Sequence, residues 1–553
     1  MKRMILGMTF ASIFLAAALG LQAVEILPLA EIKAGMKGEW VTSVEGQKLE
    51  RFPLEIVGIS RNFAAPGRDV IWARALDERN IATGPVAGMS GSPVYIEGKW
   101  VGAYAYGFLW PKDEALIGIQ PAQEMLKLWE APEGLSSASQ AQQPLTLALA
   151  GFSARTVEAF APSFEKLGLD IKSGAALGKM ESASQKLEAG SPLAAVLMDG
   201  DFGIAAVGTV SALDEKSGRL LAFGHPFMGR GKSDVPLANA EVVTVVSTLD
   251  KSFKLANVGE IIGAITLDRM PGIVGQVGLK PELAEVEFDF KKEGYSDKKF
   301  AARLWADPQV APIIAGMAFM EALGSLDGLG QKQRLAGRVE ARVEHNGREN
   351  ILSWEFMYSQ EGAEVVLASR LGEKLAKILD NPYETVKLKS LTVSAELKDG
   401  WERYEALSLT PISARARAGE AFKVALVTQG YRKELRRDVF EIQIPKNAEG
   451  SLKLALLDFA KLREENNALQ KSARDFAQLL RSEGEEPLPN RLLARLSGAG
   501  GSAILEGGRL NDLPPTTLMN LEKPSAERVL AENEWTFEAP ITLGEGRFEL
   551  EIK

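Results

Sequence analysis

One short turn of the sequence carries residues that could do nucleophilic chemistry. Ser90 stands within the run Gly88-Met89-Ser90-Gly91-Ser92-Pro93. The flanking glycines permit a sharp turn that presents the serine hydroxyl free of bulky neighbours. In such a turn the amides of Ser90 and Gly88 can converge on one point and stabilise a developing oxyanion. The same run also fits a plain Gly/Ser surface turn, so other residues must decide between the two interpretations.

A serine nucleophile needs a base, and this chain offers few. It contains no cysteine and only two histidines, His225 and His345. His225 ends a strand-like run in a Gly-His-Pro corner, which places an imidazole at a sheet edge; a structural turn histidine is the alternative. His345 precedes Asn346-Gly347, a strong two-residue hairpin signal, and we expect no catalytic role for it. The same scarcity argues against the usual zinc sites, and we expect no metal and no cofactor.

Two aspartates are candidates for orienting the His225 ring. Asp77 directly follows a strand-like run and lies shortly before Ser90. Asp234 lies in the glycine-rich loop after His225, where it could instead support that loop through an Asx-type turn. We favour Asp77, because the orienting carboxylate must be shielded from water and a glycine-rich loop shields poorly.

The sequence around these residues predicts short strands separated by turns, and these strands would position the candidate side chains. Alternating apolar residues over 36–75 and 94–106 predict strands on both sides of the serine turn, and a short helix is expected over 122–129. Residues 190–201 predict a strand pair and 207–227 a hairpin that ends near His225. Residues 241–278 alternate again and are rich in glycine, as barrel-forming strands are. The polar, small-residue run 131–144 predicts a linker between the two groups.

Length and charge limit the class of protein. A chain of 553 residues should hold about three domains. Its net charge of −9 argues against nucleic acid or an anionic membrane surface as the main partner. Residues 1–23 combine a basic start, an apolar run and a small residue, Ala23, which predicts a signal peptide and a periplasmic or secreted protein. A membrane anchor is the alternative, but we expect no stable membrane span after cleavage.

The second half of the chain changes in composition near residue 331. Charged, regular strands predict a β-sandwich-like accessory domain over 331–445, interrupted by one amphipathic helix with leucines at 367, 371, 375 and 379. The remaining segment, 446–553, is predicted to be a small α+β unit that contains a helical stretch over 460–482.

Several of these motifs together resemble one peptidase family. The run Leu49-Glu-Arg-Phe-Pro-Leu-Glu-Ile-Val57, continued through Asp77 and Thr83-Gly-Pro-Val-Ala-Gly-Met-Ser-Gly-Ser-Pro93, looks like the serine half of the sporulation stage IV B peptidases, peptidase family S55. The pairing of Val207-Gly-Thr-Val-Ser211 with Phe223-Gly-His225 looks like their histidine half. The likeness covers about residues 36–280. This chain carries the halves in permuted order, and the family's usual PDZ module is not recognisable.

The resemblance implies a mainly β fold with a chymotrypsin-like double β-barrel peptidase domain over 24–330. Its serine half would span 24–130, and its histidine half 145–330 after the linker. It further implies an exported serine endopeptidase that hydrolyses peptide bonds in a protein or peptide substrate through an acyl-enzyme. The alternative is a catalytically inactive envelope protein that binds peptides or a partner. An esterase is a weaker third interpretation, because no strand-elbow-helix pattern follows the serine.

The same resemblance assigns roles to individual residues. Ser90 would be the nucleophile, His225 the general base and Asp77 the orienting acid of a Ser-His-Asp triad. The amides of Gly88 and Ser90 would form the oxyanion hole. By analogy, a strand over Tyr104, Ala105 and Tyr106 would pair with the substrate backbone.

Overall fold

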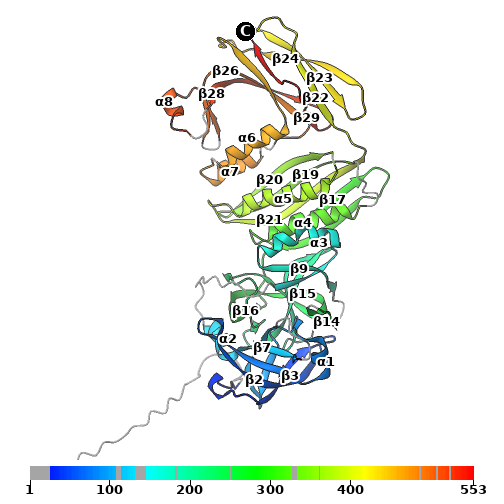
Figure 1. Cartoon of the computed structure of the whole chain (residues 1–553), viewed down its shortest axis with the longest axis vertical. Coiled ribbons are helices and arrows are strands. Elements are labelled where there is room, and N and C mark those ends of the chain that lie inside the picture. The colour runs from blue at the N-terminus through cyan, green and yellow to red at the C-terminus, as the bar shows by residue number, and fades with distance from the viewer. Residues whose placement is uncertain are drawn as a thin grey trace, which may run out of the picture.

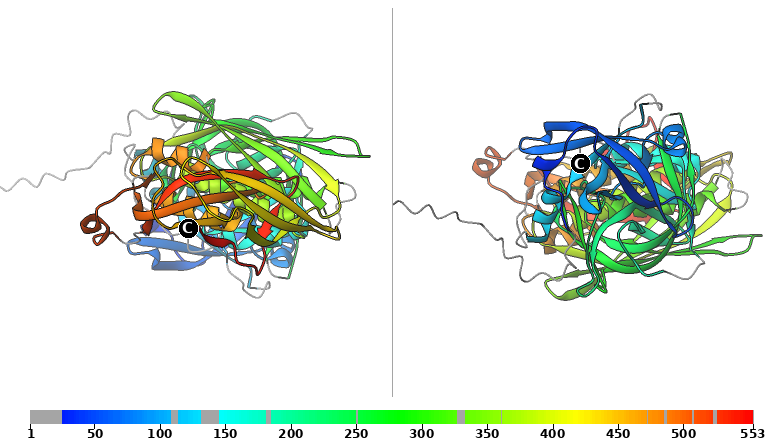
Figure 2. Two further views of the ribbon diagram at one scale, coloured as in Figure 1. Left: turned by 90° about the horizontal axis from the view of Figure 1, so that it is seen from above. Right: turned by 90° about the horizontal axis from the view of Figure 1, so that it is seen from below.

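Three β-rich bodies are stacked along the long axis of the molecule (Figure 1). The N-terminal barrel lies at one end, a large mixed sheet with helices lies in the middle, and the C-terminus lies at the far end. Figure 2 looks along this axis, and in its view from below the blue barrel strands face the viewer. The computed structural model describes residues 25–552 apart from 108–113, 131–144, 181–184, 250, 327–332, 360, 472, 485–486, 506–507 and 522–524. The expected signal peptide and linker lie outside the described residues.

Six strands of the serine half close into a barrel in the order β1-β2-β3-β7-β6-β5. Their bounds are β1 (Lys37–Ser43), β2 (Leu49–Ala65), β3 (Arg68–Ala75), β5 (Pro93–Ile96), β6 (Lys99–Tyr106) and β7 (Leu116–Pro121). The inward residues of these strands form one core cluster that includes Trp40, Leu54, Ile71, Val94 and Ile119. Closure leaves the barrel without free edges. Three short helices flank it: η1 (Leu29–Glu31), α1 (Glu78–Thr83) and α2 (Ala122–Glu130).

The strands of the predicted histidine half belong to a larger, open sheet. They are β8 (Leu145–Ala150), β9 (Leu169–Lys179), β10 (Pro192–Gly200), β11 (Gly203–Asp214), β12 (Arg219–Ala222), β13 (Gly231–Lys232), β14 (Pro236–Val246), β15 (Ser252–Arg269) and β16 (Gly272–Val277). The prediction of a mainly β protein is confirmed. A double barrel is not confirmed, because the sheet continues from β10 into β18 and the sheets of the described residues include one closed barrel.

The same sheet runs across the boundary predicted at residue 330. β17 (Leu283–Lys292) pairs in parallel with β21 (Val386–Asp399), and β21 pairs with β19 (Gln333–His345). The remaining strands are β18 (Lys298–Trp305) and β20 (Arg348–Tyr358), and the helices over one face are α3 (Ala154–Glu165), α4 (Ala311–Gly324) and α5 (Ala363–Leu379) (Figure 1). The boundary at 330 is therefore corrected: residues 333–399 complete the sheet that begins in the histidine half.

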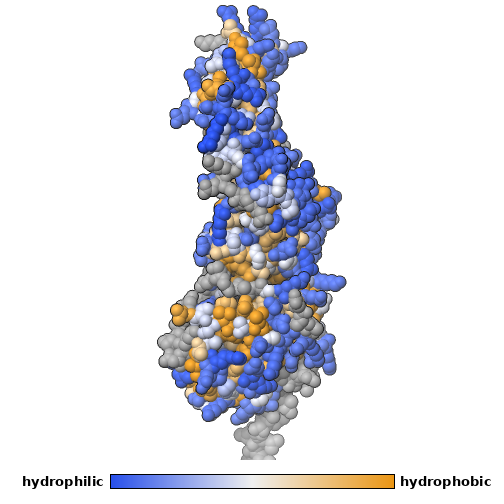
Figure 3. Space-filling view, turned by 90° about the vertical axis from the view of Figure 1, so that its right-hand side faces the viewer, coloured by the Kyte–Doolittle hydropathy of each residue, from blue (hydrophilic) through white to orange (hydrophobic). Residues whose placement is uncertain are grey.

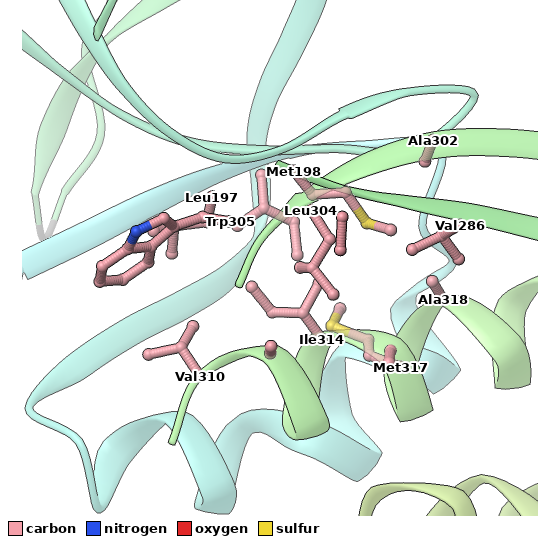
Figure 4. Close-up of a cluster of buried hydrophobic side chains, with 14 of the residues drawn as sticks. Leu197, Met198, Val286, Ala302, Leu304, Trp305, Val310, Ile314, Met317 and Ala318 are labelled. Carbon is pink, nitrogen blue, oxygen red and sulfur yellow. The ribbon is translucent and has the colours of Figure 1, made fainter. Parts of the chain in front are cut away.

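The helix α4 anchors this layer because it is almost entirely apolar, with Glu321 as its one ionisable residue, and most of its residues are buried. Its residues Ile314, Met317 and Ala318 are buried beneath the strands that carry Met198, Val286 and Leu304 (Figure 4). The predicted amphipathic helix with leucines at i+4 steps is α5, and its leucines are buried in the same core cluster.

The last body is a β-sandwich built from residues 404–552. One sheet holds β22 (Tyr404–Pro411), β23 (Ala421–Gly430), β24 (Leu435–Gln443) and β29 (Ile541–Leu543); the other holds β25 (Leu452–Leu457), β26 (Arg491–Leu505), β27 (Gly508–Leu510), β28 (Ser525–Thr536) and β30 (Glu549–Ile552). Residues from both sheets share one core, so the predicted sandwich over 331–445 and separate segment 446–553 are corrected. The predicted helical stretch is two helices, α6 (Phe459–Lys471) and α7 (Phe476–Gly484), and a short α8 (Pro515–Leu518) follows.

Apolar side chains on one face gather at the level where the barrel meets the large sheet (Figure 3). The upper part of that face, over the sandwich, is mostly hydrophilic (Figure 3). Within the described residues, no helix combines the length and apolar character that a membrane crossing requires.

The continuous sheet predicts where the chain can be cut. We expect a fragment of residues 25–400 to be soluble and to unfold cooperatively. A fragment of 25–330 should aggregate, because it leaves β17 without its parallel partner β21 and uncovers α4 where α5 packs. Gel filtration and thermal melts followed by circular dichroism compare the two fragments. A monomeric, cooperatively melting 25–330 fragment would contradict this domain boundary.

Candidate active site

The Ser90 turn lies between the barrel and the large sheet. The short strand β4 (Val86–Ala87) leads into the turn and pairs in parallel with the start of β15, whereas β5 leaves the turn and belongs to the barrel. Gly88 and Gly91 have φ angles of 96° and 100°, in the region where only glycine is relaxed. The sharp glycine turn expected from the sequence is therefore present, and Ser90 itself is half-buried.

Thr209 of β11 holds this turn from the large sheet. Its amide donates to the Ser90 carbonyl at 2.8 Å, and its Oγ1 donates to the Gly88 carbonyl at 3.0 Å. Two residues on, Ser211 Oγ donates to the Gly91 carbonyl at 2.7 Å. The carbonyls of these three turn residues are thus fixed by side chains and backbone of the other body.

The orientation of the Ser90 amide follows from its neighbours. The Met89 carbonyl accepts from the Ser92 amide at 2.9 Å and from Ser92 Oγ at 2.6 Å. Because a trans peptide group directs its C=O and N–H in opposite directions, the Ser90 N–H points away from Ser92. Among the described residues, no carbonyl accepts a hydrogen bond from this amide. It is therefore available as a donor, as an oxyanion hole requires.

Two close backbone approaches bring the His225 segment onto the serine turn. A Cβ atom on Gly91 would lie 2.6 Å from the backbone nitrogen of Phe223, so only glycine fits there. A Cβ atom on Gly224 would lie 3.2 Å from the Cβ of Ala103 and 3.4 Å from the Tyr104 carbonyl oxygen. The segments that carry Ser90 and His225 therefore meet, although within the described residues no hydrogen bond joins the two side chains.

The backbone before His225 has an unusual conformation. Phe223 is fully buried and has a φ of 67°, and Gly224 follows with a φ of 68°. A bulky residue with positive φ is rare, and such backbone clusters at active and binding sites. The Phe223 ring meets the His225 ring edge to face, with centroids 6.0 Å apart. The imidazole is thus set in place by a strained corner and one aromatic contact.

The hydrogen bond of His225 fixes its tautomer. Its Nδ1 lies 2.8 Å from the Pro226 carbonyl oxygen. A carbonyl can only accept, so Nδ1 carries the proton and Nε2 presents a lone pair. Burial lowers the pKa of His225, and the hydrogen bond to Pro226 opposes this only in part. The ring is therefore neutral near pH 7, which is the state that a general base needs.

Neither candidate carboxylate reaches this ring. Asp77 is the N-cap of α1, where its Oδ1 accepts from the Asn80 amide at 2.9 Å and from Asn80 Nδ2 at 2.8 Å. Asp234 accepts from the Trp305 indole nitrogen at 2.8 Å. Among the described residues, His225 has no hydrogen bond to a carboxylate, so the orienting role assigned to Asp77, and to Asp234 as its rival, is not supported. Asp77 was misassigned because the six-residue helix that it caps has too short a pattern to be recognised.

The strand predicted to pair with substrate is β6, one of the six strands that form the barrel. The Tyr104 amide donates to the Ser92 carbonyl at 2.9 Å, and the Tyr104 carbonyl accepts from the Gly91 amide at 2.7 Å. Both backbone groups of Tyr104 are therefore occupied, and its assignment as a substrate-pairing residue is corrected. Ala105 is buried beside Gly224, and the Tyr106 hydroxyl donates to Gln120 Oε1 at 2.9 Å. β6 holds the serine turn in place through these contacts.

His345 lies far along the chain in the large sheet. It ends β19, and the predicted hairpin at Asn346-Gly347 is confirmed by the pairing of His345 with Arg348. Its Nδ1 lies 2.7 Å from Glu384 Oε2, and its ring packs on Phe476.

Two buried ionisable residues near the site were missed in the sequence. Asp268 of β15 accepts from the amides of Phe227, Met228 and Gly229 at 2.8, 2.7 and 2.7 Å, which ties down the loop after His225. An aspartate within the apolar run Ile265-Thr-Leu-Asp268 was a usable signal, because a buried carboxylate needs donors.

The second is Lys254, also of β15. It is only 2% exposed, and its Nζ lies 2.7 Å from Thr42 Oγ1 and 3.4 Å from Thr209 Oγ1. Its aliphatic stem packs against Gly88, at 3.1 Å from the position of a Cβ. Burial lowers the pKa of Lys254 to about 7, and no carboxylate among the described residues is bonded to it. The amine therefore lies at the barrel–sheet junction without a counter-charge.

Compared with family models, with curated proteins and with solved structures, the chain matches none. Within the described residues, no group of three or more acidic or histidine side chains is placed to hold a metal ion.

The cap at Asp77 gives a simple test of its role. We expect Asp77→Ala to lower the free energy of unfolding by about 1 kcal/mol, because the first turn of α1 loses its acceptor. Asp77→Asn should be nearly neutral, since asparagine caps equally well. Urea unfolding of the two variants measures this. A marked loss of activity in a fully stable Asp77→Asn protein would instead return Asp77 to the catalytic group.

The pKa of Lys254 predicts a pH-dependent stability. In the unfolded chain a lysine titrates near 10.4, whereas in the folded protein the pKa is about 7. Between these values the unfolded chain binds the extra proton, so stability should rise with pH by up to about 1.4 kcal/mol per unit. Lys254→Met should remove this slope and be the more stable protein at pH 7. Lys232→Met, at an exposed site, is the matched control; equal slopes in both variants would show that Lys254 is charged when folded.

Proposed function

We propose that the chain is an exported serine endopeptidase, as its resemblance to the sporulation stage IV B peptidases implies, with Ser90 as nucleophile and His225 as base. The observation that carries the proposal is the packing of the serine turn on the backbone that bears His225. Gly91 lies against Phe223, and Gly224 lies against β6, so contact between the two segments is built into the backbone. The barrel and the 145–277 strands would serve as the two halves of the peptidase unit.

In the proposed reaction Ser90 Oγ attacks the scissile carbonyl while His225 Nε2 takes its proton. The negative charge that develops on the carbonyl oxygen is stabilised by the Ser90 N–H, with Gly88 N–H as the second donor. His225 then gives the proton to the leaving amine, which leaves an acyl-enzyme on Ser90. A water molecule activated by the same imidazole hydrolyses the ester and frees the serine.

The neutral ring of His225 favours this assignment. Its bare Nε2 is the atom that must accept the serine proton, and its Nδ1–H is held by the Pro226 carbonyl. In the usual triad a carboxylate holds Nδ1–H; here a backbone carbonyl has that position. Catalytic hydrogen bonds often lengthen in the absence of substrate, so a missing Ser90–His225 bond does not oppose the proposal.

A peptide- or partner-binding protein without catalysis is the second candidate. It is favoured by one observation: within the described residues, the His225 ring has no carboxylate at Nδ1. A binding module would keep the paired bodies and the glycine turn but would need neither the Ser90 hydroxyl nor the Nε2 lone pair.

A fluorophosphonate probe and hydrolysis of unfolded casein separate the two candidates. We expect the purified protein to be labelled at Ser90 and to cleave casein, and Ser90→Ala to lose both activities. His225→Ala should lose about as much turnover as Ser90→Ala, because members of a cooperative catalytic group fail together. The matched control is His345→Ala, which should retain full activity.

Other outcomes assign the site differently. Retained cleavage in His225→Ala together with its loss in Lys254→Met would make the buried amine the base. Absence of labelling and of cleavage in the unaltered protein, with equal peptide binding by Ser90→Ala, would favour the binding module.

A further inference from the structure

One peptide group joins the His225 ring to a buried carboxylate. The carbonyl of Pro226 lies 2.8 Å from His225 Nδ1, and the N–H of the same peptide group, that of Phe227, donates to Asp268 Oδ1 at 2.8 Å. The two hydrogen bonds leave the peptide at opposite ends. His225, the Pro226–Phe227 peptide and Asp268 therefore form one continuous chain of hydrogen bonds.

Asp268 is a buried carboxylate surrounded by backbone N–H donors. Only 2% of it is exposed, Oδ1 accepts from Phe227, and Oδ2 accepts from Met228 and Gly229 at 2.7 Å each. The Arg230 backbone amide is a further partner. All of these partners are N–H donors, and an ionised carboxylate accepts from them better than a protonated one does. Burial raises the pKa of Asp268 above its ordinary value, and the backbone N–H donors oppose that effect only in part. No cationic side chain among the described residues pairs with it, so its charge is directed at the loop that carries His225.

Hydrogen bonds in series polarise one another, and they do so most strongly where water is excluded. A carboxylate that accepts from the Phe227 N–H polarises this N–H bond. The polarisation increases the negative charge on the Pro226 carbonyl oxygen and makes it a stronger acceptor. That carbonyl then holds Nδ1–H more firmly and favours the protonated ring that must form during proton transfer.

We propose that Asp268 is the positioning acid of this site and acts on His225 through the Pro226–Phe227 peptide. It keeps the imidazole in the Nδ1–H tautomer and stabilises the imidazolium. The consequence for catalysis rests on the proposed function, whereas the effects on tautomer and on titration do not.

The ionisable groups around the ring determine the sign of the effect. Lys251 lowers the pKa of His225 by its charge, whereas burial of Lys254, which packs against Gly88, favours its neutral amine. Arg230, at the end of the loop, pairs with Asp307. Asp268 is a negative charge bonded to the loop that carries His225, and it acts in the direction opposite to Lys251, so its removal should make His225 harder to protonate.

The test compares Asp268→Asn with Asp234→Asn in the full chain. Both variants carry His345→Gln, so that His225 gives the single histidine signal in ¹⁵N spectra. We expect Asp268→Asn to lower the pKa of His225 by about one unit and to reduce the Nδ1–H tautomer. Asp234→Asn also removes one negative charge, but from a carboxylate that contacts Trp305. It should leave the pKa of His225 and its tautomer unchanged. An unaltered pKa and tautomer in a folded Asp268→Asn protein would overturn the proposal.

The protein with an intact Asp268 supplies a second test that needs no stable variant. Pro226–Phe227 is the only Pro-Phe step in the chain, so ¹³C-carbonyl proline with ¹⁵N-phenylalanine labels this peptide alone. Its amide signal should shift with the same midpoint as the His225 ring. A signal that stays fixed throughout the His225 titration would exclude coupling through the peptide.

Turnover then separates this proposal from the previous one. If Ser90-dependent cleavage exists, Asp268→Asn should lower kcat on the order of 10-fold with little change in KM, as expected for loss of stabilisation in the transition state. Coupling in the spectra without any cleavage would support the positioning role and reject the peptidase. Cleavage at the full rate with unchanged spectra would reject only the role of Asp268.

Discussion

The candidate site depends on the hydrogen bonds that Thr209 donates to the serine turn. Its amide and hydroxyl bind the carbonyls of Ser90 and Gly88, and the same hydroxyl lies within reach of the buried Lys254 amine. One threonine of the large sheet thereby sets the geometry of a loop that the barrel strands β5 and β6 continue. Neither body alone contains the turn, Thr209 and the histidine, so the candidate site exists only at the junction between them.

The junction is polar but holds few ionised groups. Burial favours the neutral forms of both Lys254 and His225, which leaves Asp268 as the buried carboxylate beside the loop. Unpaired charge is costly in such surroundings, and each group is instead satisfied by hydroxyl or backbone partners. A neutral imidazole next to a turn whose Ser90 amide has no carbonyl acceptor among the described residues would suit a reaction in which charge develops only in the transition state.

Local patterns in the sequence predict most strands, the Asn346-Gly347 hairpin and the glycine turn, because each depends on neighbours within a few residues. The domain boundary at 330 fails because β17 pairs with β21 across a long separation that no local signal encodes. The triad acid fails for a related reason. Asp77 lies near Ser90 in the chain but caps its own helix, whereas Asp268 comes to the His225 loop through the register of β15 with β13. A turn can be predicted from a few neighbouring residues, whereas the partner of a buried side chain depends on how distant strands pair.

The pairing of β4 with β15 also determines the order in which the molecule can be completed. The serine turn appears early in synthesis, yet the strand beside it, the threonine that clamps it and the carboxylate behind His225 all come much later in the chain. Contacts of such long separation form slowly, since the intervening loop must close first. A nascent or incompletely folded chain thus bears a serine with no fixed surroundings. The proposed site is complete only when both bodies have folded and docked, so any activity that it has would begin at that step.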